Sequence, residues 1–159
     1  MPRIDIRIKS QELVFYDENK NEATRYSVST ARNGAGEQTG SNCTPRGKHI
    51  VRAKIGGGTP ENTVFVGRRP TGEIYSVELK EQFPNRDWIL TRILWLSGCE
   101  IGFNRLGSVD SMQRYIYIHS TPESVPMGVP ASHGCILMRG PDIIELFERV
   151  AVGTAVDIT

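Results

Sequence analysis

The chain contains the stretch Tyr115-Ile116-Tyr117-Ile118-His119-Ser120 and, after a loop with several prolines, Ser132-His133-Gly134-Cys135-Ile136. Its β-branched and aromatic residues predict a strand over 114–118 that delivers His119 to a cleft. Gly134 lets backbone N–H groups approach a substrate carbonyl. We expect a neighbouring histidine and the following helix to lower the pKa of the Cys135 thiol. A cysteine nucleophile with a histidine base is an arrangement that performs acyl transfer.

Short apolar alternations, separated by glycine and proline, continue on both sides of these stretches. Isoleucines alternate with polar residues over 4–8, which is typical of a half-buried strand. A helix is predicted from Pro141, because the apolar residues after it recur at spacings of three and four and share one face. We therefore expect a mostly-β fold with one or more short helices. Further strands are predicted at 13–16, 26–30, 49–54, 63–66, 88–96 and 156–158.

Composition restricts the class of protein. The 159 residues fit one domain, 1–159, and the net charge of +1 argues against a nucleic-acid-binding surface. No apolar run approaches the roughly 18–20 residues that span a bilayer, so no membrane span is expected. The first residues lack the apolar segment of a signal peptide. We expect a cytoplasmic protein as written, or a periplasmic one if a leader has been removed.

The pattern His119-Ser120 followed by Ser132-His133-Gly134-Cys135-Ile136 closely resembles the signature of the L,D-transpeptidase catalytic domain, the YkuD-like family. Thr44-Pro45-Arg46-Gly47 resembles a turn of that family, and 142–147 resembles its helix after the nucleophile. The resemblance covers nearly the whole chain and implies a single-domain YkuD-like β-sandwich.

The resemblance also implies a role for each matching residue. Cys135 would be the nucleophile and His119 its base, with the Ser120 carbonyl fixing the imidazole tautomer. His133 would support the site, and the N–H groups of Gly134 and Cys135 would form an oxyanion hole. We expect the substrate to contact Arg139, Ser132 and Tyr117.

One position departs from the family pattern. Members often carry arginine or asparagine two residues after the nucleophile, where this chain has Leu137. Arg139 lies two residues further on and is the candidate to supply the missing charge. The departure leaves the nucleophile assignment standing but puts recognition of a substrate carboxylate in doubt.

The reaction that the resemblance implies is cleavage of the bond between the L-centre of residue three and the terminal D-Ala of a peptidoglycan tetrapeptide stem. A Cys135 thioester would pass the acyl group to an amine, as in a transpeptidase, or to water, as in an L,D-carboxypeptidase that trims recycled muropeptides. No metal or organic cofactor is implied. Carbapenem-type β-lactams would acylate Cys135.

Other interpretations remain open at this point. His119, His133 and Cys135 could be zinc ligands, although their spacing is unusual for zinc. A non-catalytic peptidoglycan-binding module would only hold a stem peptide. A thiol-redox protein is disfavoured, because the three cysteines Cys43, Cys99 and Cys135 form no Cys-x-x-Cys pair. We expect Cys43 and Cys99 to be inert and buried, and Trp88 and Trp95 to lie in the core. His49, Arg68-Arg69 and Arg86-Asp87 are expected on the surface.

Overall fold

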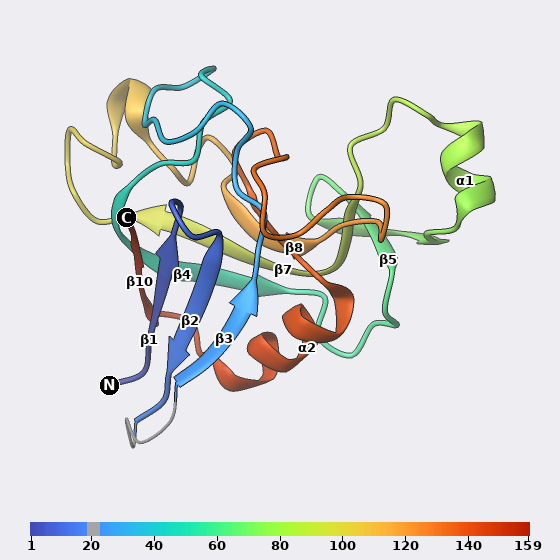
Figure 1. Cartoon of the computed structure of the whole chain (residues 1–159), viewed down its shortest axis with the longest axis horizontal. Coiled ribbons are helices and arrows are strands. Elements are labelled where there is room, and N and C mark those ends of the chain that lie inside the picture. Colours follow the sequence, from blue (N-terminus) through green and yellow to red (C-terminus); the bar gives the residue numbers. More distant parts are fainter. Residues whose placement is uncertain (19–22) are drawn as a thin grey trace.

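The computed structural model describes residues 1–18 and 23–159, and the ten strands in this part of the chain join in one sheet (Figure 1). The prediction of a mostly-β fold with short helices is confirmed. In chain order the elements are β1 (Arg3–Arg7), β2 (Glu12–Tyr16), β3 (Ala23–Ser27), β4 (Gly47–Ile55), β5 (Thr63–Val66), β6 (Arg69–Ile74), α1 (Val77–Gln82), β7 (Ile89–Gly98), a 3₁₀ turn (Gly107–Val109), β8 (Tyr117–Ser120), β9 (Ile136–Met138), α2 (Gly140–Arg149) and β10 (Ala155–Ile158).

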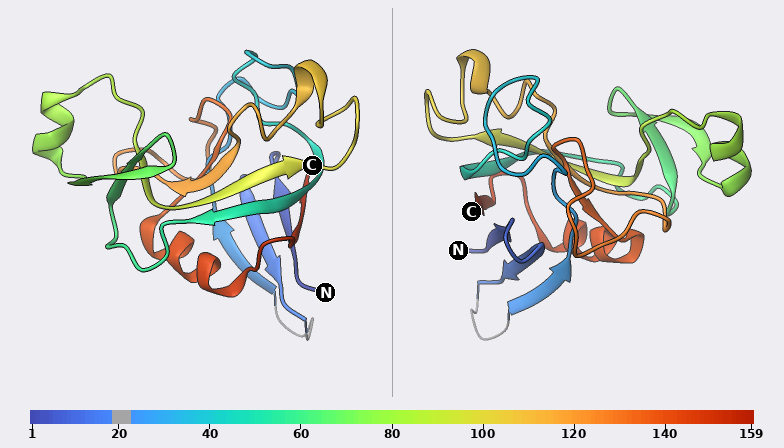
Figure 2. Two further views of the ribbon diagram at one scale, coloured as in Figure 1. Left: turned by 180° about the vertical axis from the view of Figure 1, so that it is seen from behind. Right: turned by 45° about the horizontal axis from the view of Figure 1, so that its top comes forward.

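The strand β7 organises the sheet around the site. β5 pairs with its first residues and β4 with the rest, so both lie along one edge of β7. β8 pairs antiparallel along the opposite edge and β9 then pairs parallel to β8. β6 pairs with β5, and the other four strands extend the sheet beyond β4 in the order β10, β1, β2, β3. Figures 1 and 2 show β1, β2 and β3 steeply inclined to β4 and β7, so the sheet bends around its interior.

One large apolar cluster fills this interior. Its buried side chains come from β1 to β4, from β7 to β10 and from α2. The predicted helix face is confirmed, because Ile143, Leu146 and Phe147 of α2 are buried. The helix contacts both β7 and β8, and β8 is the strand that carries His119. The core therefore supports the site from behind.

Two predicted strands are displaced, and both displacements occur beside the site. The strand predicted at 26–30 ends at Ser27, because Ser29 and Ala31 turn to bridge Leu137 and Ser132 instead. The strand predicted at 114–118 begins only at Tyr117. Tyr115 has a φ of 57°, a left-handed conformation that interrupts an extended strand.

The segment from β5 through α1 forms a projection at one end of the molecule (Figures 1 and 2). α1 has no buried residue, and its first turn is capped by the Ser76 hydroxyl, which accepts from Leu79 N–H at 3.0 Å. In the part of the chain that is described, neither helix has the length and apolar character needed to cross a bilayer.

Candidate active site

The parallel pairing of β8 with β9 places the side chains of His119 and Cys135 on the same face of the sheet. In this register Ile118 lies opposite Ile136, and His119 lies opposite Leu137. Side chains alternate between the two faces of a strand, so Cys135 and Leu137 share one face with His119. Ile118 and Ile136 point the other way, into the main core. The sheet register thus fixes the two reactive side chains on one surface.

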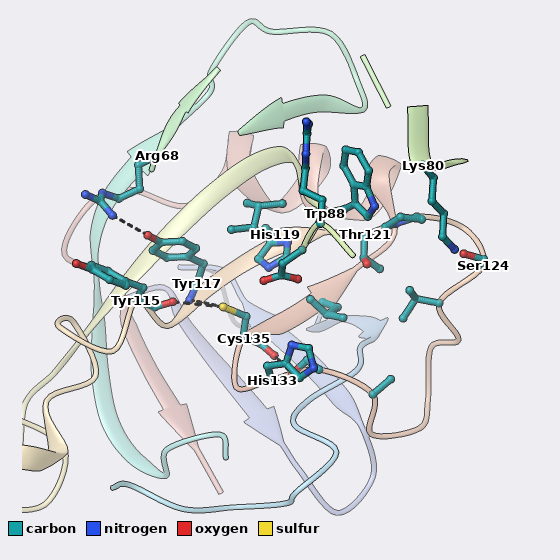
Figure 3. Close-up of a pocket in the computed structure, with 18 of the residues that line it drawn as sticks. Arg68, Lys80, Trp88, Tyr115, Tyr117, His119, Thr121, Ser124, His133 and Cys135 are labelled. Atoms are coloured by element: carbon teal, nitrogen blue, oxygen red, sulfur yellow. Dashed lines mark hydrogen bonds between the residues drawn. The ribbon is translucent and has the colours of Figure 1, made fainter. Parts of the chain in front are cut away.

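That surface is the wall of a cavity of about 700 Å³ (Figure 3). Figure 3 shows His119 and Cys135 entering from the sheet and His133 from the rim, while Lys80 reaches from α1 toward Ser124 on the opposite loop. A volume of this size accommodates a peptide segment or a drug-sized molecule. The predicted residues that line it are Ser132, His133, Cys135, His119 and Tyr117.

The Cys135 thiol is held by the backbone of the neighbouring strand. Its Sγ accepts from Tyr117 N–H at 3.4 Å and lies 3.3 Å from Tyr115 O. Burial raises the pKa of the thiol to about 12, so the free protein contains a neutral thiol at neutral pH. The predicted lowering of this pKa is wrong. Strand β9 separates Cys135 from α2, which begins only at Gly140, and the helix N-terminus is not next to the sulfur.

The His119 imidazole is buried and oriented by its neighbour. Its Nδ1 lies 2.7 Å from Ser120 O, a contact that places the ring proton on Nδ1 and leaves Nε2 as an acceptor. Burial lowers the pKa of His119 below its ordinary value of 6.5. At neutral pH the free protein therefore holds a neutral imidazole and a neutral thiol in the wall of one cavity.

A hydrogen bond between the hydroxyls of Ser120 and Thr91 ties the strand that carries His119 to the adjacent strand β7. The Ser120 hydroxyl donates to Thr91 Oγ1 at 2.6 Å, and Thr91 Oγ1 also accepts from Asn62 N–H at 3.0 Å. Thr91 lies where the β7–β8 register shifts and has a φ of 73°. Thr91 could not be identified from the sequence, because nothing near it in the chain indicates contact with a residue 29 positions away.

The turn that precedes the nucleophile is closed by side-chain hydrogen bonds. Gly134 has a φ of 135°, and an added Cβ would lie 3.2 Å from Cys43 O, so glycine is needed there. Its N–H donates to Ser132 Oγ at 3.1 Å, and that hydroxyl donates to Cys135 O at 2.6 Å. Gly134 N–H is thus occupied, and a role in the expected oxyanion hole would require it to leave Ser132. The Thr44 hydroxyl donates to Gly134 O at 2.9 Å and fixes the turn from the other side.

Of the three expected substrate contacts, the structure places one apart from the cavity. Tyr117 lines it and accepts a hydrogen bond from Arg68 Nη1 at 3.1 Å. Ser132 lines it too, but its hydroxyl is engaged within the turn. Among the described residues that form the lining, Arg139 does not appear. Arg139 occupies the N-cap position of α2, and its guanidinium donates to the carbonyls of residues 122 and 123, at 3.5 and 3.3 Å.

Several charged side chains line the cavity. From the sequence, these residues were expected elsewhere or were not identified. Arg68, Arg86 and Asp87, which were expected on a solvated face, all line the cavity; Asp87 is exposed there, and Arg68 and Arg86 are half-buried. Lys80 and Arg114 join them. Arg114 Nη2 donates to Cys43 O at 2.6 Å, and burial lowers the pKa of its guanidinium. These residues come from distant segments, so no local pattern predicts their meeting.

The surface prediction for His49 is wrong. Its side chain is buried, with Nε2 2.8 Å from Ser111 Oγ and Nδ1 3.0 Å from Gly47 O. It therefore ties β4 to the segment that leads into β8. Cys99, expected to be buried, is exposed. Within residues 1–18 and 23–159, no group of three or more His, Cys, Asp or Glu side chains is placed to hold a metal ion.

Comparison with known proteins gives a consistent result. Residues 1–158 match the family described as the L,D-transpeptidase catalytic domain, YkuD. A stretch of 43 residues is 46% identical to "Probable L,D-transpeptidase YbiS" of Escherichia coli K12, which is 27% of this chain and 14% of that protein.

Solved structures show the same fold. L,D-transpeptidase 3 from Mycobacterium tuberculosis, in complex with a faropenem-derived adduct, superposes with a TM-score of 0.60 at 16% identity, over 99% of this chain and 60% of that one. An L,D-transpeptidase in complex with imipenem gives 0.59 at 18% identity, over 99% and 58%. This chain therefore spans less than two thirds of the length of these relatives.

Proposed function

Because the chain belongs to the L,D-transpeptidase catalytic domain family, we propose that residues 1–159 form a single catalytic domain that transfers acyl groups through a thioester on Cys135. The observation that carries this proposal is the placement of the Cys135 thiol and the His119 imidazole on one face of two paired strands, in the wall of one cavity. The proposed substrate is a peptidoglycan tetrapeptide stem, whose terminal D-Ala is released.

The proposed first step is general-base-assisted attack. His119 Nε2 accepts the Cys135 proton as Sγ attacks the carbonyl carbon of residue three. Backbone N–H groups near Cys135 stabilise the oxyanion. The protonated His119 then donates to the departing amine of D-Ala, which leaves a thioester. The neutral states of the free thiol and imidazole support this order, because proton transfer must accompany attack.

The cationic lining supports an anionic substrate. Arg68, Lys80 and Arg114 lie in the same cavity as the thiol, and a stem peptide carries several carboxylates. We propose that these side chains take the part that a polar residue at position 137 plays in relatives. Arg139 is the weaker candidate, because it is not among the described residues that line the cavity.

The test uses a β-lactam and a natural donor. Solved relatives hold imipenem and a faropenem-derived adduct, so we expect imipenem to add one acyl group to this protein. Intact-mass spectrometry should detect the adduct on the wild type and none on Cys135→Ala. Incubation with a disaccharide-tetrapeptide should release D-Ala with the wild type only.

The products then separate the alternatives. A cross-linked dimer or an exchanged terminal residue indicates transfer, and tripeptide alone indicates an L,D-carboxypeptidase. Binding of the tetrapeptide with no adduct and no D-Ala release would leave the non-catalytic binding module as the better interpretation and would refute the proposal.

A further inference from the structure

The connection between α1 and β7 places a carboxylate in the cavity. Asp87 is exposed and lines the same space as His119 and Cys135. Its two neighbours are anchored. Arg86 Nη1 donates to Glu73 Oε1 at 2.8 Å, and the buried Trp88 ring packs edge-on against Tyr75 at 5.1 Å between centroids. The backbone that carries Asp87 is therefore fixed on both sides.

The carboxylate itself is not engaged. Across the described ranges 1–18 and 23–159, no hydrogen bond or ion pair to Asp87 is found, although four cationic side chains share the cavity. Arg86 is bound to Glu73, Arg68 to Tyr117 and Arg114 to a backbone carbonyl. Asp87 is the one carboxylate in this part of the chain that lines the cavity.

The charge of Asp87 acts on both reacting groups. It raises the pKa of the His119 imidazole and that of the Cys135 thiol, in each case as a smaller contribution than burial. Asp87 therefore shares the cavity with both reacting groups, and its charge reaches both of them.

We propose that Asp87 binds the ammonium group of the acceptor amine and thereby favours transfer of the acyl group over its hydrolysis. This inference rests on the proposed function. The reaction is R–CO–S–Cys135 + R′–NH₃⁺ → R–CO–NH–R′ + HS–Cys135 + H⁺. One ammonium proton is lost to solvent before attack. His119 accepts a second as the C–N bond forms, and returns it to sulfur as the C–S bond breaks.

The geometry of the reaction favours binding of the acceptor amine at Asp87 over binding of an amine that belongs to the donor. The attacking nitrogen must reach both the carbonyl carbon on Cys135 and the His119 ring, because His119 removes its proton. A side-chain amine on the donor peptide is separated from the reacting carbonyl by its own methylene groups. It does not need to reach either the carbonyl carbon on Cys135 or the His119 ring. A carboxylate near both reacting groups therefore suits the attacking amine.

The test compares Asp87→Asn with the wild type, using disaccharide-tetrapeptide as donor and two acceptors at pH 7. Glycinamide is mostly cationic at this pH and hydroxylamine is uncharged. Mass spectrometry measures the ratio of transfer product to hydrolysis product. We expect Asp87→Asn to raise the KM for glycinamide about tenfold, as for the loss of one charge-assisted contact. Transfer to hydroxylamine and hydrolysis both respond to the effect of the Asp87 charge on His119 and Cys135, so they should change by the same smaller factor and their ratio should stay constant.

Two further variants and the imipenem assay complete the test. Glu148→Gln removes the same charge from the exposed surface of α2 and should leave the ratio unchanged, whereas Asp87→Glu should restore transfer to glycinamide. An unchanged glycinamide KM in Asp87→Asn, or an equal loss with both acceptors, would overturn the inference while imipenem still acylates Cys135. A wild type that forms no acyl-enzyme with tetrapeptide or imipenem would instead overturn the proposed function, and this inference with it.

Discussion

Individual residues set the protonation state from which the chemistry begins. His119 and Cys135 are both neutral in the free protein, because burial disfavours the imidazolium and the thiolate alike. Some cysteine enzymes store a ready-made thiolate–imidazolium pair. In the proposed mechanism the proton moves only when a substrate is present, and a neutral thiol is less readily oxidised than a thiolate.

The rate of acylation should therefore follow the ionisation of His119. Its pKa is lowered from 6.5, so the imidazole is neutral and able to accept a proton above that lowered value. We expect the rate of imipenem acylation to rise with pH through a midpoint below 6.5 and to level off near neutrality. Stopped-flow or quenched mass measurements from pH 4.5 to 8 test this. A midpoint above 7 would contradict the assignment of His119 as base.

Thr44 should matter more than its ordinary side chain suggests. Its buried hydroxyl donates to Gly134 O and accepts from Ala31 N–H, both at 2.9 Å. We expect Thr44→Val to lower the free energy of unfolding by about 1–3 kcal/mol, because two buried backbone groups lose their partner. Urea denaturation measures this, and imipenem acylation should slow as well.

A matched substitution serves as the control for Thr44. Thr39→Val replaces an exposed threonine in the same loop, and we expect it to change the free energy of unfolding by less than about 0.5 kcal/mol. An equal effect of the two substitutions would show that the turn does not depend on the buried hydroxyl.

The sequence was informative about residues whose surroundings are local. Cys135 and His119 were both identified from local motifs, and both line the cavity. The contact of His119 with Ser120 O joins neighbours in the chain. Thr91, Arg68 and Asp87 could not be found in this way. Each reaches the site through pairing of distant segments, and an arginine or aspartate in a loop gives no local sign of what it will face.

Among the elements near the cavity, α1 is held without a buried residue of its own. Lys80 from this helix nevertheless lines the cavity. We expect Ser76→Ala to remove the N-cap and destabilise α1 by about 0.5–2 kcal/mol. Amide exchange in residues 77–82 should quicken while global unfolding stays unchanged. Ser76→Asp should keep the slow exchange, and equal exchange in Ser76→Ala and wild type would contradict the assigned cap.

Strand prediction succeeded where side chains alternate and failed where the backbone departs from an extended conformation. β1 was expected from its isoleucines, and Ile4 and Ile6 are buried. The boundary of β8 was misplaced, since a tyrosine with positive φ at position 115 cannot be recognised from its neighbours. The bridges made by Ser29 and Ala31 depend on the sheet that they join.

The stability of the whole molecule should depend on pH through its buried histidines. Burial lowers the pKa of His49 and of His119 below 6.5 in the folded state. The unfolded chain therefore binds more protons near and below pH 6.5, and stability is lost as the pH falls through this range. We expect the free energy of unfolding, from urea titrations, to be lower at pH 5 than at pH 7.5.

A substitution isolates the share of His49. His49→Gln removes one titrating group while keeping a polar partner for Ser111, so the difference in stability between the two pH values should shrink. A pH dependence unchanged by His49→Gln would mean that other groups, such as the carboxylates, account for it.

The parallel register of β8 and β9 has a consequence for how such a protein can diversify. Strand pairing sets the distance between the proposed nucleophile, Cys135, and the proposed base, His119. The loop of residues 121–131 that joins the two strands lies outside that pairing and lines the cavity. Insertions, deletions and rapid sequence drift in this loop can reshape the entrance without separating the reacting pair. A lineage, or an engineer, can thus alter which molecules are admitted while inheriting the chemistry intact.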